Sequence, residues 1–209
     1  MRGILLSLVV FLPTVGAVII GLLPRGERDE TVKRAALAVA LLTFLVSLPL
    51  YTGFDARMAD YQFQERRSWM PSLGITYHVG VDGISLLLVL LTTFLMPVTL
   101  LASWHAIEKR WKEFAITMLL LETGMLGVFV ALDLFLFYIF WEAMLIPMYL
   151  VIGIWGGVKR VYAAVKFFIF PQTSGLMMLV AIVAPAVVHA RIAGVFTFDY
   201  TQLLGTPLP

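Results

Sequence analysis

Six apolar runs, each about long enough to cross a lipid bilayer, dominate this sequence. They cover residues 4–23, 34–51, 84–104, 114–132, 134–155 and 161–188. The hydrocarbon core takes roughly 20 apolar residues to cross, and a helix satisfies its own backbone hydrogen bonds there. Charged residues make up only 13% of the chain and gather between the runs. We therefore predict an all-α polytopic membrane helix bundle of about six transmembrane helices, with residues 1–209 forming a single transmembrane domain.

The distribution of Lys and Arg predicts the orientation, because short cytoplasmic loops carry an excess of basic residues. The connections after the first, third and fifth runs hold nine of them: Arg25, Arg28, Lys33, Arg34, Lys109, Arg110, Lys112, Lys159 and Arg160. The opposite side holds five over far more sequence: Arg2, Arg57, Arg66, Arg67 and Arg191. We expect both ends of the chain to lie on the periplasmic side of a bacterial inner membrane.

The long polar stretch over residues 52–83 is expected on the same side. It contains Gly, Pro and aromatic residues without a helical period, so we interpret it as an ordered extramembrane loop. Asp82 and Asp133 each precede an apolar run, and we interpret them as N-terminal caps of the helices that follow.

Composition restricts the chemistry that the chain can perform. The sequence has no cysteine, which excludes disulfides, thiolate metal sites and iron–sulfur ligation. The three histidines, His78, His105 and His189, fall at or beyond the ends of apolar runs, and no pair has a spacing suited to haem or zinc. We expect no cofactor and no metal. The net charge of +2 comes from Lys and Arg in the loops, so we expect the lipid bilayer, and no nucleic acid, as a partner.

Glu142 is the most informative polar residue, because it lies near the middle of the fifth run. An ionisable group at the bilayer centre costs roughly 2.5–3.5 kcal/mol, so its presence indicates a function or a close partner. Pro147 lacks an N–H and leaves the carbonyl of Ala143 without its helical partner beside the carboxyl group. We interpret Glu142 as a proton-relay residue. The alternative is a structural anchor, hydrogen-bonded to a neighbouring helix.

Two further ionisable residues fall inside apolar runs. At 1.5 Å per residue, Glu122 and Lys166 lie roughly 12 and 8 Å from the cytoplasmic ends of their helices, against about 20 Å for Glu142. We therefore expect Glu122 and Lys166 to pair, with Lys166 as the cytoplasmic-side relay cation. The alternative is that Lys166 extends its ammonium group to the lipid headgroups.

Four segments carry a resemblance to a known family: residues 77–86 (YHVGVDGISL), 127–133 (GVFVALD), 140–157 (FWEAMLIPMYLVIGIWGG) and 166–169 (KFFI). They resemble the antiporter-like subunit M of proton-translocating NADH:quinone oxidoreductase, respiratory complex I. The similarity runs from end to end, and the segment WEAMLIPMY favours subunit M over the sister subunits L and N and over subunits of sodium/proton antiporters.

The resemblance implies a fold of fourteen helices with two inverted five-helix repeats, and a proton channel in which Glu142 takes the place of the fifth-helix glutamate. It implies a subunit of an oxidoreductase whose redox centres reside in other chains, with the sister antiporter-like subunits as partners. The lysine partner of that glutamate belongs to a broken seventh helix beyond the similar region, so we expect a second polypeptide or a longer gene product to supply it. A cation/proton antiporter subunit and a non-conducting membrane scaffold remain as alternatives.

Overall fold

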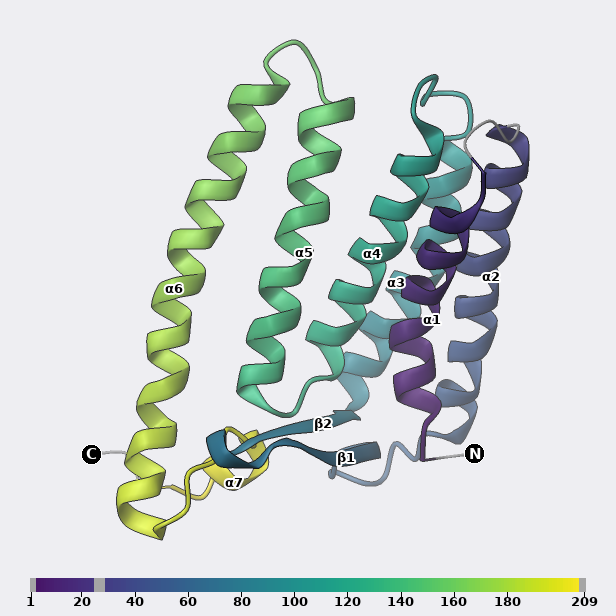
Figure 1. Ribbon diagram of the computed structural model, residues 1–209. Coiled ribbons are helices and arrows are strands. Elements are labelled where there is room, and N and C mark those ends of the chain that lie inside the picture. The colour runs from purple at the N-terminus through teal and green to yellow at the C-terminus, as the bar shows by residue number, and fades with distance from the viewer. Residues whose placement is uncertain (1–2, 25–28, 207–209) are drawn as a thin grey trace.

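The computed structural model describes residues 3–24 and 29–206, and in this part of the chain six long helices run side by side (Figure 1). They are α1 (Leu5–Leu22), α2 (Asp29–Gly53), α3 (Gly83–Ala102), α4 (Trp111–Val130), α5 (Leu134–Trp155) and α6 (Arg160–Ala193). Each is long and apolar enough to cross a membrane. The predicted bundle of six membrane-spanning helices is confirmed, although the chain also contains a short β-hairpin. Of the basic residues used to predict orientation, Arg2, Arg25 and Arg28 lie outside the described residues.

Two helices extend well beyond the apolar runs from which they were predicted. Helix α2 begins at Asp29, five residues before the expected start, and α6 continues to Ala193, five residues past the expected end. Gly194 then ends α6 in the left-handed conformation, with φ of 72°. Hydropathy marks only the part of a helix that lies in hydrocarbon, whereas helical hydrogen bonding continues through the headgroup region.

Helix α4 occupies the centre of the bundle and packs against α1, α2, α3 and α5, whereas α6 packs mainly against α5. Figure 1 shows α5 and α6 as a pair beside the other four helices. Glycines bring α4 and α5 together: a Cβ at Gly124 would lie 2.8 Å from Cβ of Met144, and one at Gly127 would overlap with the ring of Phe140. These contacts fix the register of the antiparallel α4–α5 pair.

The expected loop over residues 52–83 contains an antiparallel hairpin of β1 (Gln62–Met70) and β2 (Ile75–Val81), joined through a short 3₁₀ helix, η1 (Pro71–Leu73). The hairpin lies across one end of the helices, next to the short helix α7 (Tyr200–Leu203) (Figure 1). The sequence did not predict the strands, because β1 is largely polar and charged and the pairing has two irregularities in its register.

Carboxylates fasten the hairpin end of the bundle. The predicted caps are confirmed: Asp82 accepts from the first backbone N–H groups of α3, and Asp133 does the same for α5. Asp133 also accepts from the backbone N and Oγ1 of Thr76 in β2, at 2.9 and 3.0 Å. The start of α5 is thereby tied to the hairpin.

Both ends of α1 are held by charged side chains from other elements. Glu65 of β1 accepts hydrogen bonds from the backbone N of Leu6 and Ser7, at 2.8 and 3.2 Å. Lys112 of α4 donates to the carbonyls of Gly21 and Leu23, at 3.0 and 2.5 Å. An anion at the N-terminus and a cation at the C-terminus both suit the helix dipole.

Candidate functional site

Glu142 lies where α5 meets α6. It is about 12 Å along α5 from the hairpin end and about 20 Å from the other end. A Cβ added to Gly175 of α6 would overlap with Glu142 Oε1, so the carboxyl group rests directly against that glycine. The side chain is half-buried, and Oε1 is buried without a hydrogen-bond partner among the described residues. The sequence predicted an acid at this depth, and the structure places it at a helix–helix contact.

Pro147 lies inside α5 and is buried. Because proline has no N–H, the carbonyl of Ala143 lacks its partner four residues on. This carbonyl belongs to the residue after Glu142, so a free backbone acceptor and an acid lie side by side. Such a pair of polar groups can bind water inside a helix bundle.

Glu122 is fully buried in α4, with 0% of its surface exposed. Within residues 3–24 and 29–206, neither of its carboxyl oxygens has a hydrogen-bond partner. An acid that is buried without a partner is costly, and in a membrane protein it suggests a function that needs an ionisable group there.

Glu122 and Glu142 lie closer in depth than the sequence suggested. Because Gly124 faces Met144 and Gly127 faces Phe140, Glu122 is offset from Glu142 by about one helical turn, or ~5 Å along the axis. The estimate from sequence differed because α4 begins at Trp111, which puts Glu122 about 16 Å from the start of the helix.

The expected pairing of Lys166 with Glu122 is not formed. Lys166 is exposed on α6, and its Nζ lies 4.6 Å from the centre of the Tyr162 ring. It is nine residues from Gly175, which is two and a half helical turns, so it points away from the face of α6 that packs on α5. Counting residues along the helices places Glu122 and Lys166 at similar depths. It does not show that α5 lies between their helices, or that Lys166 lies on the face of α6 that points away from α5.

A second cluster of ionisable groups, which the sequence analysis missed, lies at the hairpin end. Asp199, with 0% of its surface exposed, is 3.0 Å from Nδ1 of His78 and 2.9 Å from a guanidinium nitrogen of Arg66. Burial raises the pKa of Asp199, but hydrogen bonds from His78 and Thr201 and the charges of His78 and Arg66 outweigh it and lower the pKa to about 2. Asp199 lies beyond the last apolar run, and no local pattern links it to His78 and Arg66, which come more than 100 positions earlier.

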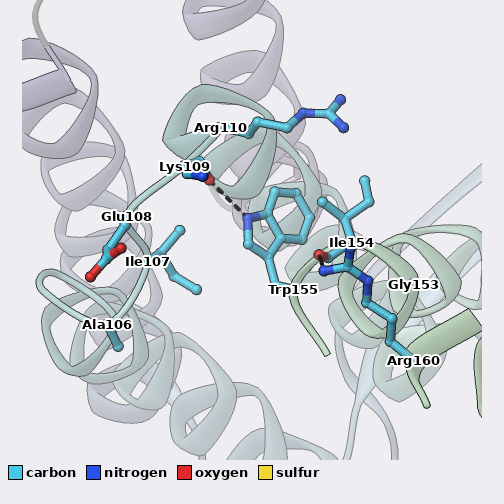
Figure 2. Close-up of a pocket in the computed structure, with 9 residues that line it drawn as sticks. All are labelled: Ala106, Ile107, Glu108, Lys109, Arg110, Gly153, Ile154, Trp155 and Arg160. Atoms are coloured by element: carbon cyan, nitrogen blue, oxygen red, sulfur yellow. Dashed lines mark hydrogen bonds between the residues drawn. The ribbon is translucent and has the colours of Figure 1, made fainter. Parts of the chain in front are cut away.

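The opposite end of the bundle has an open pocket of about 510 Å³ between the α3–α4 connection and the ends of α5 and α6. Figure 2 shows Trp155 donating from Nε1 to the carbonyl of Lys109, at 3.0 Å, and Arg160 donating to the carbonyl of Ile154, at 2.9 Å. Its deepest residue on α5, Gly153, is about 16 Å along the helix from Glu142. The pocket joins the helix ends and does not reach the acids.

No cluster of three or more His, Asp or Glu side chains is positioned to hold a metal ion in the described part of the chain. The buried carboxyl groups of Glu122 and Glu142 are groups that can bind and release protons.

Comparison with known proteins identifies the family. The model of "NADH-ubiquinone oxidoreductase chain 4, amino terminus" matches residues 8–130, more than half of the chain. The chain belongs to this family. A second model, "NADH:quinone oxidoreductase/Mrp antiporter, TM", matches residues 131–203. The boundary falls between α4 and α5, so the chain 4 model covers Glu122 and the antiporter model covers Glu142 and Lys166.

The individual relatives of this chain support the resemblance to subunit M. NADH-quinone oxidoreductase subunit M of Rhodobacter capsulatus is 52% identical over 183 residues, which are 86% of this chain and 35% of that protein. Among solved structures, respiratory complex I from Thermus thermophilus with bound NADH matches 98% of this chain and 40% of its own, with a TM-score of 0.79 and 29% identity. The Mrp complex from Dietzia sp. DQ12-45-1b shares the fold, with a TM-score of 0.75 and 17% identity over 99% of this chain and 21% of its own. The chain therefore spans about a third of the length of the curated relative.

Proposed function

We propose that this chain is a non-redox membrane-arm subunit of NADH:quinone oxidoreductase and carries part of a proton-translocation channel, driven by quinone reduction elsewhere in the complex. The observation that carries this proposal is the position of Glu142, an acid held at mid-depth against Gly175 in the α5–α6 contact. A carboxyl group there can exchange a proton when water or a cation approaches it, because burial favours its neutral form and a nearby positive charge favours its ionised form.

Glu122 gives the proposed path a second proton-binding position. It lies about one helical turn from Glu142 along the axis, on the helix that packs against the other side of α5. Lys166 faces away from both acids, so its proposed role as relay cation depends on groups that cover the outer face of α6. This geometry supports a main proton path through Glu122 and Glu142. Lys166 would then exchange protons with groups on the outer side of α6.

The test uses the assembled complex in inverted membrane vesicles, in which NADH-driven proton uptake and NADH oxidation are measured together. Glu142→Gln removes the ionisable proton but keeps the shape, so uptake should fall about tenfold or more. Glu142→Asp should retain part of the uptake. Glu108→Gln, which changes an exposed acid on the same chain, is the matched control. Full pumping by Glu142→Gln would exclude the relay role and favour the scaffold alternative.

Lys166→Met and Glu122→Gln test the other two residues in the same vesicles. A relay function predicts that each lowers proton uptake while the complex still assembles. If Lys166→Met leaves uptake unchanged, Lys166 serves only to reach the lipid headgroups. If Glu122→Gln leaves uptake unchanged, the path does not use the buried acid of α4.

The second candidate is a subunit of a cation/proton antiporter, because the family model matching residues 131–203 is shared between the oxidoreductase and Mrp antiporters. The two functions differ in their energy source. Vesicles that take up protons on addition of NADH support the oxidoreductase, whereas sodium/proton exchange without NADH supports the antiporter.

We also propose that the chain lies in the bacterial inner membrane, with both ends and the hairpin on the periplasmic side and sister antiporter-like subunits as neighbours. The basic residues support this orientation. The α3–α4 and α5–α6 connections lie at the end of the bundle opposite the hairpin (Figure 1). These connections and the helix starts that follow them carry Lys109, Arg110, Lys112, Lys159 and Arg160.

A further inference from the structure

A cavity of about 530 Å³ opens between α1, α5 and the hairpin. Its walls within the bundle are apolar: Phe11 comes from α1, and Leu136, Ile139 and Phe140 come from α5. The ring centres of Phe11 and Phe140 lie 6.2 Å apart. We call this space the α1–α5 slot.

The slot enters the apolar part of the bundle from the hairpin side. Phe11 and Phe140 are each six residues from the hairpin end of their helix, which is about 9 Å along the axis. That depth is roughly a third of the ~30 Å hydrocarbon core. The slot can therefore take up an apolar chain that starts at the membrane surface.

The mouth of the slot carries a free cation. Arg67 of β1 lines it and is exposed, and across the described ranges no carboxylate lies within 4.0 Å of its guanidinium group. Its neighbour Arg66 is instead bound to Asp199. Arg67 pairs across the hairpin with Tyr77. The ring centre of Tyr77 lies 6.5 Å from that of Phe11, on the hairpin side of the slot.

Trp69 completes the mouth and is 48% exposed. Tryptophan is typical of the membrane–water interface, and arginine binds phosphate through several donors at once. An apolar slot with an exposed arginine and a tryptophan at its mouth has the polarity of a phospholipid, with its phosphate outside and its hydrocarbon chain inside.

We propose that the α1–α5 slot binds a phospholipid from the leaflet on the hairpin side, with one acyl chain against Phe11 and Phe140 and its phosphate at Arg67. A side chain or helix of a neighbouring protein would fill only the apolar part, whereas a phospholipid also accounts for the exposed Arg67 at the mouth, which has no carboxylate partner among the described residues. The lipid fills the space between α1 and α5 next to the hairpin.

The test uses the complex in vesicles of phosphatidylethanolamine and phosphatidylglycerol that contain a trace of phosphatidylglycerol with a photoreactive acyl chain. The vesicles are diluted into unlabelled lipid before illumination, so that loosely bound lipid exchanges. Mass spectrometry then compares labelling of residues 136–140 in the slot with that of residues 176–180, on an exposed part of α6. A bound lipid predicts that the slot keeps its label after α6 has lost it.

The variants separate headgroup binding from the mere presence of a gap. Arg67→Gln should lower the retained slot label about fivefold, the effect of one basic residue near an anionic lipid surface. Arg67→Lys should restore most of it. Arg57→Gln, which removes an exposed arginine from the same side of the bundle, should change nothing. Ile139→Trp should block the slot, and co-purification with the assembled complex shows that each variant has folded.

Two outcomes would overturn the proposal. Equal loss of label from the slot and from α6 would mean that only exchanging bulk lipid enters. Absence of slot label, together with photochemical cross-links from residues 136–140 to another polypeptide, would assign the slot to a protein partner. Inorganic phosphate added alone should not displace the label, because the acyl chain contributes to binding.

Discussion

The carboxyl group of Glu142 occupies the space that a side chain at residue 175 would need. The contact joins an acid of α5 to a glycine of α6, and no other residue type at position 175 leaves the carboxyl group where it is. The glycine therefore positions the acid, and it does so from a helix 33 residues further along the chain.

Gly175→Ala tests this relationship. The new methyl group would meet the end of a flexible side chain, so the carboxyl group should move while the helices stay in place. We expect the free energy of unfolding to change by less than about 1 kcal/mol. NADH-driven proton uptake should fall about tenfold, because small displacements of a reacting group are costly.

Gly153→Ala is the matched control for this variant. It adds a methyl group to the same α5–α6 contact, 3.5 Å from Cβ of Ala164, which is an ordinary distance. Uptake should therefore remain normal. If Gly175→Ala pumps as well as Gly153→Ala, the position of the Glu142 carboxyl group is not important for transport.

Gly127→Ala should weaken the α4–α5 contact. Its methyl group would overlap with the ring of Phe140, which is confined between helices, and overpacking of this kind costs about 1–3 kcal/mol. Thermal unfolding in detergent measures the effect, and Phe140→Leu in the same chain should recover part of it. Gly21→Ala, 3.9 Å from the nearest side-chain atom, should unfold like the wild type.

Asp199→Asn should destabilise the hairpin end in a pH-dependent way. The pKa of Asp199 is lowered from 3.8 to about 2 in the folded protein, so its charge stabilises the fold above pH ~4 and this contribution disappears as the pH falls through about 2. The shift corresponds to about 2 kcal/mol. Unfolding of the variant and the wild type should differ most at pH 7 and converge between pH 4 and 2. Asp60→Asn, at an exposed site, should show no such trend.

Single cysteines can test the orientation, because residues 1–209 contain none. Ser72→Cys places a thiol on the exposed turn of the hairpin, and Ala106→Cys places one in the exposed α3–α4 connection. A membrane-impermeant maleimide should label the first in spheroplasts and the second in inverted vesicles. The reverse pattern would contradict the periplasmic placement of the hairpin.

The sequence predicted the six helices because the length of an apolar run is set by the thickness of the bilayer. It also predicted that Glu142 is an unusual acid, since a charge in the middle of an apolar run stands out. It could not show that Gly175 is the contact residue, because a small residue in an apolar run is compatible with many helix partners.

The failures have a common physical cause. Whether Lys166 and Glu122 meet depends on which side of each helix they occupy and on which helix lies between, and spacing along the chain gives neither. The Asp199–His78–Arg66 cluster and the hairpin likewise depend on pairings between distant segments. Among the described residues, these contacts join segments that are far apart in the sequence, so only the folded structure reveals them.

The two charged residues that hold the ends of α1 have a consequence for biosynthesis. Glu65 follows the amide that it binds by 59 residues, and Lys112 follows the carbonyls that it binds by 91 and 89. At about 5–20 residues per second, the ribosome needs on the order of ten seconds to deliver them after the helix itself has been made. Helix α1 is therefore synthesised well before the two side chains that hold its ends.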